Sequence, residues 1–256
     1  MTESEMIKSP EGIAKARIAG HLAARVLQMI EPHVQPGVTT DQLDALCHDF
    51  IVNELDAIPA NIGYQGYTKT TCISVNHVIC HGIPSDKVLK KGDIVNVDVA
   101  LIKDGWYGDT SRMFYAGEPS ILARRLVDTT LEALHASIAV VRPGATLGDV
   151  GFAITTVAHR EGFSVVEEYC GHGIGQVYHD DELQVLHYGQ PGKGLILQEG
   201  MIFTIEPMIN AGQRYSKVLK DGWTVVTKDH SLSAQWEHMV LVTQDGHEIL
   251  TPWPES

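Results

Sequence analysis

The chain has 256 residues with a formal net charge of -13, and 44% of its residues are hydrophobic. A length and composition of this kind are ordinary for a globular domain with a buried core, and the negative charge without a long basic run argues against a nucleic-acid function. Four scattered cysteines without a CxxC pair, no signal-peptide core and no membrane-length apolar run predict a cytoplasmic protein without a membrane function.

The N-terminal part of the chain predicts two helices followed by a strand. Ser9-Pro10 is typical of a helix start, with serine as the N-cap and proline at the first helical position. The apolar face of this helix would comprise Ile18, Leu22, Val26, Met29 and Ile30. Thr39 and Gln42 resemble a capping box that opens a second helix. A short strand is expected at residues 71–75, after a loop rich in glycine and tyrosine.

The pair Asp104-Gly105 stands between two runs rich in valine and isoleucine, which predicts a β-hairpin. Asn96 and Asp98 interrupt the first run two positions apart, so both point to the same face. A two-residue loop would place Asp98 and Asp109 diagonally across the two strands on that face. Two carboxylates in such an apolar setting repel each other and lose solvation. Either this face is solvated or a divalent cation, which prefers carboxylate oxygens, compensates for them.

Two motifs in the chain occur twice. The turn motif PGVT returns as PGAT at a shift of 107 residues, and the strand motif GDIVNVD returns as GMIFTIE at a shift of 108. The second match puts Glu206 at the position that corresponds to Asp98. We therefore expect an α+β fold in one catalytic domain, residues 1–256, with related halves at roughly 10–118 and 119–250 and a site between them.

Acids in apolar strand settings supply the candidate ligands, namely Asp98, Asp109, Glu206 and Glu237. Any one of them alone would be better explained as a solvated or salt-bridged acid, but four together favour a site. His172 is the favoured histidine because the motif GHGIG predicts a tight glycine loop in which the backbone approaches a ligand closely. One histidine with four carboxylates suits two hard or borderline divalent ions that share bridging carboxylates.

These motifs together resemble the type I methionine aminopeptidases, and the resemblance covers residues 7–250. It is carried by CHGIP at residues 80–84, the Asp98 and Asp109 segments, GHGIG at 171–175, FTIEPM at 203–208 and the acid of QWEHM. The resemblance implies the pita-bread metallopeptidase fold. In this fold two pseudo-symmetric halves form a curved, mostly antiparallel sheet that is covered by helices, and a dinuclear metal site lies between the halves.

The resemblance also implies a function: removal of the N-terminal methionine from nascent proteins when the second residue is small. Two divalent ions (Co, Mn, Fe or Zn) would be bound by Asp98, Asp109, His172, Glu206 and Glu237, with Asp109 and Glu237 bridging. Glu206 would transfer the proton of the attacking water, and His179 would stabilise the tetrahedral intermediate. His81 would contact the peptide nitrogen beyond the scissile bond.

Two further groups of residues follow from the resemblance alone. The methionine pocket would be lined by Tyr64, Tyr67, Cys72, Tyr178 and Trp223. His81 and His179 would bind the substrate as well. A monovalent cation would be bound by Asn76, Val78 and Ser233. The chain departs from its relatives at 180–183, where it has one residue more and no proline, so we expect a reshaped loop beside Tyr178.

Other interpretations stay open at this point. An X-Pro aminopeptidase or dipeptidase of the same superfamily would share the ligands but usually carries an extra N-terminal domain, for which the sequence has no room before Ser9. A non-catalytic binding protein on this fold would be expected to have lost ligands. Lys87, Lys90 and Lys91 could contact the ribosome or form an ordinary solvated turn. The working expectation is a monomer, which the sequence does not fix.

Overall fold

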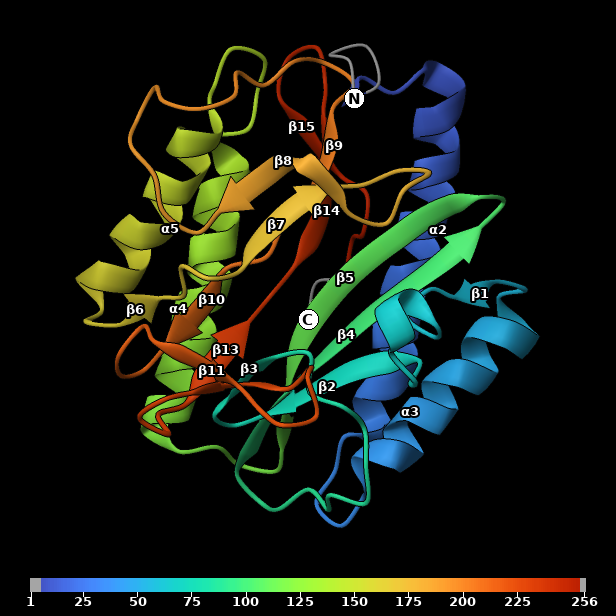
Figure 1. The fold of residues 1–256 in the computed structure, drawn as a ribbon, viewed down its shortest axis with the longest axis vertical. Coiled ribbons are helices and arrows are strands. Elements are labelled where there is room, and N and C mark those ends of the chain that lie inside the picture. Colours follow the sequence, from blue (N-terminus) through green and yellow to red (C-terminus); the bar gives the residue numbers. More distant parts are fainter. Residues whose placement is uncertain (1–5, 254–256) are drawn as a thin grey trace.

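A computed structural model describes residues 6–253 of the chain. Its longer helices lie on the outside, α2 (Pro10–Ile30) and α3 (Thr40–Asp49) on one side and α4 (Ile121–Ala139) and α5 (Leu147–Arg160) on the other, with the strands between them (Figure 1). This arrangement confirms the expected α+β class. Within the described part of the chain, no helix combines the length and hydrophobicity that crossing a bilayer requires.

The strands of the described residues pair antiparallel in four sheets. One sheet joins β1 (Ile58–Pro59), β4 (Asp93–Lys103) and β2 (Thr71–Val75), with β5 (Trp106–Ala116) also paired to β4. A five-stranded sheet has the order β15 (His247–Ile249), β14 (His238–Val242), β9 (Ile202–Ile205), β7 (Cys170–Gly173), β8 (Asp180–Leu186). One three-stranded sheet has the order β13 (Ser233–Gln235), β10 (Met208–Asn210), β6 (Ser164–Val165). The other has the order β11 (Ser216–Val218), β12 (Val225–Thr227), β3 (Val78–Cys80). Short helical turns lie at Glu31–His33, Phe50–Glu54 and Tyr64–Gly66.

The helices begin where their capping residues predict. The Ser9 side chain accepts a hydrogen bond from the backbone N–H of Gly12, and Thr39 with Gln42 forms the expected capping box. Thr146 caps α5 in the same way. One residue of the predicted apolar face differs, because Ile18 is 52% exposed whereas the other four residues of that face pack into the core.

The predicted hairpin is formed by β4 and β5. Asp104 and Gly105 both have positive φ, 50° and 79°, as a tight two-residue hairpin turn requires. Asp109 pairs with Ala100, and Asp98 pairs with the residue two positions beyond Asp109. The two acids are therefore diagonal neighbours on one face of the hairpin, as the sequence predicts.

The repeated turn motif has the same backbone structure at both of its positions. Gly37 has φ of 94° and donates its N–H to the carbonyl oxygen of Leu89 at 2.8 Å. Gly144 has φ of 87° and donates to Leu197 at 2.9 Å. A matching β-bridge follows each turn. The sequence repeat therefore has a structural counterpart.

The helix α2 packs closely on β5 at a glycine. A Cβ on Gly108 would lie 2.2 Å from the carbonyl oxygen of Ala19, which belongs to the backbone of α2. We expect Gly108→Ala to lower the free energy of unfolding by about 1–3 kcal/mol, because neither backbone segment can move without disturbing the core. Urea unfolding of the metal-free protein measures this change. Gly246→Ala is the matched control, since a Cβ there meets nothing within 4 Å, and equal midpoints for both variants would refute the prediction.

Candidate active site

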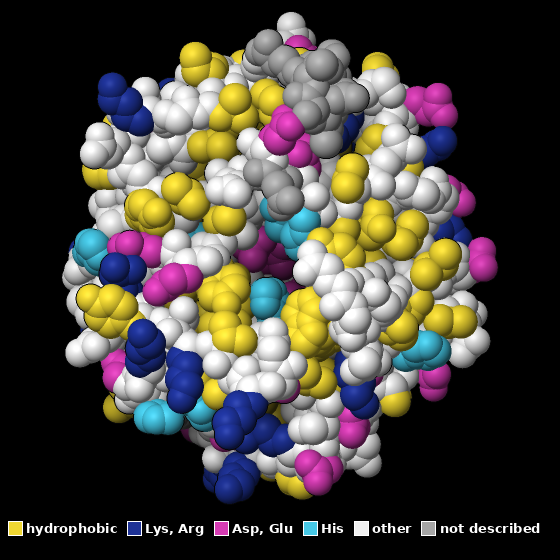
Figure 2. Space-filling view, viewed as in Figure 1, with side chains coloured by type: hydrophobic (Ala, Val, Ile, Leu, Met, Phe, Trp, Pro, Cys, Tyr) yellow, Lys and Arg dark blue, Asp and Glu magenta, His cyan; other side chains and the backbone are white. Residues whose placement is uncertain are grey.

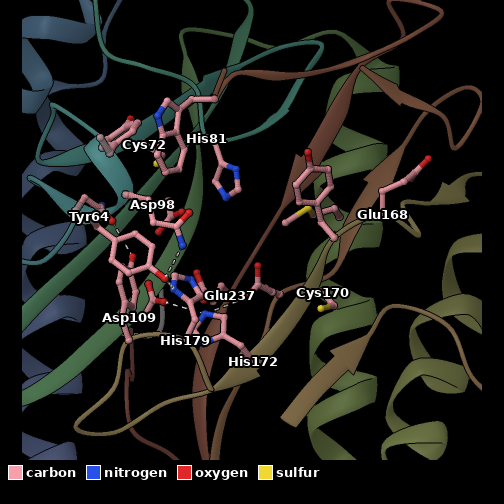
Figure 3. Close-up of a pocket in the computed structure, with 18 of the residues that line it drawn as sticks. Tyr64, Cys72, His81, Asp98, Asp109, Glu168, Cys170, His172, His179 and Glu237 are labelled. Atoms are coloured by element: carbon pink, nitrogen blue, oxygen red, sulfur yellow. Dashed lines mark hydrogen bonds and ion pairs between the residues drawn. The ribbon is translucent and has the colours of Figure 1, made fainter. Parts of the chain in front are cut away.

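A cavity of about 330 Å³ is lined by residues from strands and from the segments that connect them. The space-filling view shows the hollow near the middle of one face, with acidic and histidine side chains inside it (Figure 2). All the predicted metal ligands, both accessory histidines and all the predicted methionine-pocket residues line this cavity (Figure 3). They come from β2, β4, β5, β7 and the loops around them, so the fold brings together residues that are far apart in the sequence.

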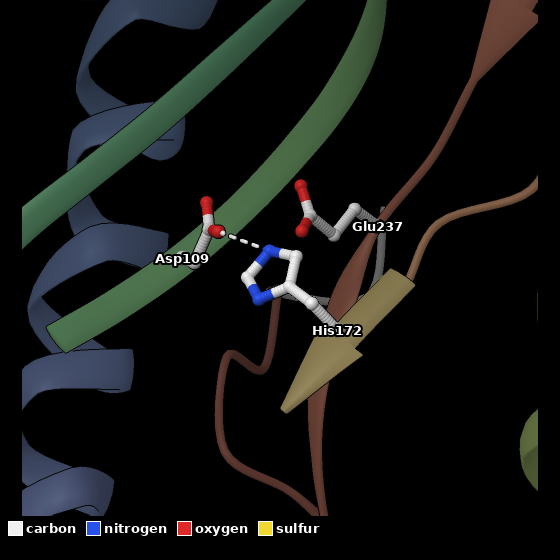
Figure 4. A group of neighbouring side chains, drawn as sticks. All are labelled: Asp109, His172 and Glu237. Atoms are coloured by element: carbon white, nitrogen blue, oxygen red, sulfur yellow. Dashed lines mark ion pairs between the residues drawn. The ribbon is translucent and has the colours of Figure 1, made fainter. Parts of the chain in front are cut away.

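Three of the candidate ligands are in direct proximity. One side-chain ligand atom from each of Asp109, His172 and Glu237 lies within 4.8 Å of the other two (Figure 4). His172 Nε2 is 3.4 Å from an oxygen of Asp109 and 3.7 Å from an oxygen of Glu206. Asp98 lines the same cavity from β4. The five side chains therefore form one cluster.

Among the described residues, no lysine or arginine pairs with the acids of this cluster, and His172 is the basic side chain beside them. Burial raises the pKa of Asp98 and of Glu237 well above their ordinary values, and neighbouring carboxylates raise them further. Burial likewise raises the pKa of Glu206 to about 7. Arg112, the arginine of β5, pairs instead with Glu31 at 2.8 Å.

A bound cation would satisfy this arrangement. The oxygen Oδ1 of Asp98 is buried and has no hydrogen-bond partner in the described part of the chain, which is unusual for a polar atom inside a protein. Carboxylate oxygens and an imidazole nitrogen are suitable ligands for borderline divalent ions, and such an ion reverses the electrostatic cost of gathering the acids. The donor set of the cavity therefore fits divalent metal ions.

The GHGIG segment has a different structure from the predicted loop. His172 lies on a strand, β7, and a Cβ on Gly171 would be 2.3 Å from the carbonyl oxygen of Thr204 in β9. The expectation of a tight glycine loop is thus wrong. The glycine is needed because the two strands pack too closely for a side chain, and this packing fixes the strand that carries His172.

The ring of His172 is oriented by its own strand. Its Nδ1 atom lies 3.1 Å from the carbonyl oxygen of Gly173, so this nitrogen carries the proton and Nε2 is left to face Asp109 and Glu206. Burial lowers the pKa of His172, but the hydrogen bond to Asp109 and the negative charges of Glu206 and Asp109 raise it on balance. Nε2 is therefore the nitrogen that is available to a metal ion.

Polar residues two positions before three of the acids support the cluster, and two of them were missed in the sequence. Thr204 donates its hydroxyl to Oε1 of Glu206 at 2.8 Å, and Gln235 donates to Oε2 at 3.2 Å. Asn96 donates to the carbonyl oxygen of Gln235 at 2.7 Å. The same spacing of two that identified Asn96 would have found the other two residues, because side chains two apart share a face of a strand.

The hairpin also holds the backbone of Glu237. Thr110, the residue after Asp109, donates its hydroxyl to the carbonyl oxygen of Glu237 at 2.7 Å. The N–H of Glu237 donates to the carbonyl oxygen of Ser111 at 3.0 Å. The strand that carries one candidate bridging acid therefore fixes the position of the other.

His81 enters the cavity from a strained backbone position. Its φ is 55°, which is uncommon for a residue other than glycine. The next residue must be glycine, since a Cβ on Gly82 would lie 2.3 Å from the carbonyl oxygen of Ile73. Burial lowers the pKa of His81 to about 4, so its ring is neutral at neutral pH.

His179 lies beside the metal-ligand cluster. Its ring centroid is 4.1 Å from that of His172, and its Nδ1 atom is 2.8 Å from the hydroxyl oxygen of Tyr64. Burial, followed by the neighbouring His172 and His81, lowers the pKa of His179 to about 3. The cavity thus holds a second neutral histidine near the acids.

The predicted methionine-pocket residues form an apolar wall on one side of the cavity. Tyr67 donates its hydroxyl to the carbonyl oxygen of Thr71 at 2.9 Å, and Tyr178 donates to Asn61 at 2.7 Å. Because both hydroxyls are bonded within the protein, the rings present mainly carbon to the cavity. The remaining members are Tyr64, Cys72 and Trp223.

The segment expected to be reshaped, residues 180–183, lies in the β7–β8 pairing. His172 pairs with Gln184 whereas Gly173 pairs with Asp180, so residues 181–183 form a bulge. Tyr178 nevertheless stays buried and lines the cavity. The shift in pairing therefore lies within β8, and Tyr178 is part of the cavity wall.

Other predicted and unpredicted residues complete the description. Ser233 donates its N–H to the carbonyl oxygen of Asn76 at 2.9 Å, and Val78 lies in β3; these three residues are near one another but do not line the cavity. Sequence reasoning missed several lining residues, which carry no distinctive spacing: Gln65, Glu168, Tyr169, Cys170, Gln184 and Met208.

The fold and this acidic, histidine-bearing cavity together define a metal-dependent hydrolase. Comparison with known families gives a match between residues 14–244 and metallopeptidase family M24. The chain belongs to this family.

Individual relatives are similar over nearly the whole chain. The methionine aminopeptidase of Escherichia coli K12 is 57% identical over 246 residues, 96% of this chain and 93% of that protein. The crystal structure of methionine aminopeptidase from Rickettsia prowazekii is 55% identical with a TM-score of 0.94, over 96% of this chain and 99% of that one. The crystal structure of an X-Pro aminopeptidase from Thermotoga maritima is 21% identical with a TM-score of 0.77, over 99% of this chain and 64% of that one. At this identity the similarity shows the fold alone.

Proposed function

We propose that this protein is a methionine aminopeptidase that removes the N-terminal methionine from nascent polypeptides and prefers a small second residue. The observation that carries the proposal is the convergence of the five candidate ligands, two neutral histidines and an apolar wall in one cavity. The similarity to methionine aminopeptidases over 96% of the chain supports it. We place the enzyme in the cytoplasm as a monomer, one domain over residues 1–256 with related halves at roughly 10–118 and 119–250.

Two divalent ions would be held in the cavity. The proposed ligands are Asp98, Asp109, His172, Glu206 and Glu237. When bound, the ions would polarise the scissile carbonyl group and lower the pKa of a water molecule. This mixed donor set accepts Mn, Fe, Co or Zn. Asn76, Val78 and Ser233 are proposed to bind a monovalent cation.

The side chains around the ions have distinct proposed roles. Glu206, held by Thr204 and Gln235 on its two oxygens, would carry the proton from water to the leaving amine. His179 would donate from Nε2 to the developing oxyanion, since the hydroxyl of Tyr64 next to Nδ1 can fix that tautomer. His81 would contact the nitrogen of the leaving peptide.

The apolar wall would select the methionine side chain. Tyr64, Tyr67, Tyr178 and Trp223 offer aromatic surface, and Cys72 adds a buried sulfur. A flexible thioether packs well against such rings. A contact of the exposed Lys87, Lys90 and Lys91 with the ribosome stays a prediction.

The specificity gives the test of the proposal. With metal content measured on the same sample, we expect kcat/KM for Met-Ala peptides to exceed that for Met-Leu peptides by about tenfold or more, because His81 crowds the space beyond the scissile bond. Equal rates on the two peptides would contradict the preference. Hydrolysis of X-Pro peptides in place of both would assign the related X-Pro aminopeptidase activity, and metal binding without any hydrolysis would indicate a binding protein.

A further inference from the structure

The last described residues of the chain, 250–253, pack against the residues that flank Glu237 in the sequence. After β15, the N–H of Leu250 donates to the carbonyl oxygen of Met239 at 2.8 Å. The hydroxyl oxygen of Thr251 accepts from the N–H of Met239 at 3.0 Å and lies 3.0 Å from Nδ1 of His238. This segment is therefore bonded to the start of β14, directly after Glu237.

The segment ends at Trp253, which contacts both sequence neighbours of Glu237. Its ring centroid is 3.7 Å from that of His238 and 5.1 Å from that of Trp236. Glu237 lines the cavity, whereas neither Trp236 nor His238 does. Trp253 thus packs against the side chains that flank the acid and point elsewhere.

The two neighbours are themselves anchored. Trp236 is buried and donates its Nε1–H to the carbonyl oxygen of Val127 in α4 at 3.1 Å, and His238 is buried beside Thr251. Trp253 packs against both of the large hydrophobic cores. It therefore joins the residues on either side of Glu237 to the body of the protein.

We propose that Trp253 is a positioning residue for Glu237: by holding Trp236 and His238, it keeps the carboxylate aimed into the cavity. This inference rests on the proposed metal site, since it assigns Trp253 to the support of one ligand. Trp253 itself does not line the cavity. Residues that orient metal ligands commonly change metal affinity by about 10–100-fold when they are replaced.

The indole of Trp253 allows a sharp test, because its Nε1 is buried and has no hydrogen-bond partner among the described residues. Trp253→Phe keeps a flat ring and loses no hydrogen bond, so it should retain the wild-type arrangement. Trp253→Ala removes the ring, while Ser111 and Thr110 still hold the backbone of Glu237. The fold should survive this change, but the carboxylate should lose its fixed orientation.

The experiment compares these variants with a core variant of similar stability loss. Leu43→Ala is the control, because Leu43 is fully buried and belongs to α3, outside the sheet that contains β14. Calorimetric titration with Co²⁺ and the visible absorption spectrum of the Co²⁺-loaded proteins are measured for each. We expect about tenfold or more weaker binding and an altered spectrum for Trp253→Ala only, with Trp253→Phe and Leu43→Ala close to wild type.

Each other outcome counts against the proposal. Wild-type affinity and spectrum for Trp253→Ala would overturn it. An equal loss in Leu43→Ala would show a general effect of stability, and an equal loss in Trp253→Phe would show that the ring is not what matters. If Trp253→Ala does not fold, Trp253→Leu takes its place against Trp253→Phe. The metal titration uses no peptide, so it does not depend on the proposed aminopeptidase activity. Failure of that activity would appear in the separate peptide assay, as wild-type protein that binds metal without hydrolysing Met-Ala peptides.

Discussion

Replacing Glu206 with glutamine is expected to reduce kcat on Met-Ala peptides by more than about 10²-fold while the fold survives. The amide keeps the size of the side chain but removes a negative ligand and the group that would carry the proton. Both oxygens of Glu206 accept hydrogen bonds, from Thr204 and Gln235, so an amide nitrogen at one of them would also face a donor. Steady-state kinetics at saturating metal measure the loss.

A matched change at the edge of the same cavity serves as the control. Glu168 lines the cavity but is exposed and takes no part in the ligand cluster. Glu168→Gln removes the same charge and should change kcat by less than about tenfold, well below the general acid–base effect. Wild-type turnover in Glu206→Gln at saturating metal would show that the role assigned to Glu206 is wrong.

The histidines of the cavity should separate into two kinds when each is replaced by alanine. His172→Ala should weaken metal binding, and added metal should partly restore activity, because Nε2 of His172 faces Asp109 and Glu206 within 3.7 Å. His179→Ala and His81→Ala should keep metal affinity near wild type. These two variants should instead have a lower kcat. The reduction for His179→Ala should be about 10²–10³-fold if His179 acts as an oxyanion donor.

Calorimetric metal titration of the three variants, with peptide kinetics on the same samples, decides between these roles. The rings of His172 and His179 lie only 4.1 Å apart, so proximity alone does not assign them. The metal affinity of His179→Ala should therefore be compared directly with that of His172→Ala. If both lose metal to the same degree, His179 is itself a ligand and the division of roles is refuted.

The sequence by itself determined the features that depend on neighbouring residues. The Asp104-Gly105 turn fixed the hairpin register, and with it the diagonal placement of Asp98 and Asp109, because a two-residue loop allows one pairing. Capping residues such as Thr39 marked the start of a helix, since they satisfy its first N–H groups locally. The family motifs then pointed to the five ligands, which line one cavity in the structure.

Only the tertiary structure decided features that depend on which distant segments pack together. The GHGIG motif has the composition of a loop, yet the contact of Gly171 with Thr204 makes it a strand. Ile18 fits the apolar period of its helix but is 52% exposed, whereas Ala16 and Ala19 are fully buried, so the orientation of α2 on the sheet turns Ile18 outward. The hydrogen bond from Thr110 to Glu237 joins residues 127 positions apart. Local propensity contains no information about such contacts, because their energy exists only once the remote partner is in place.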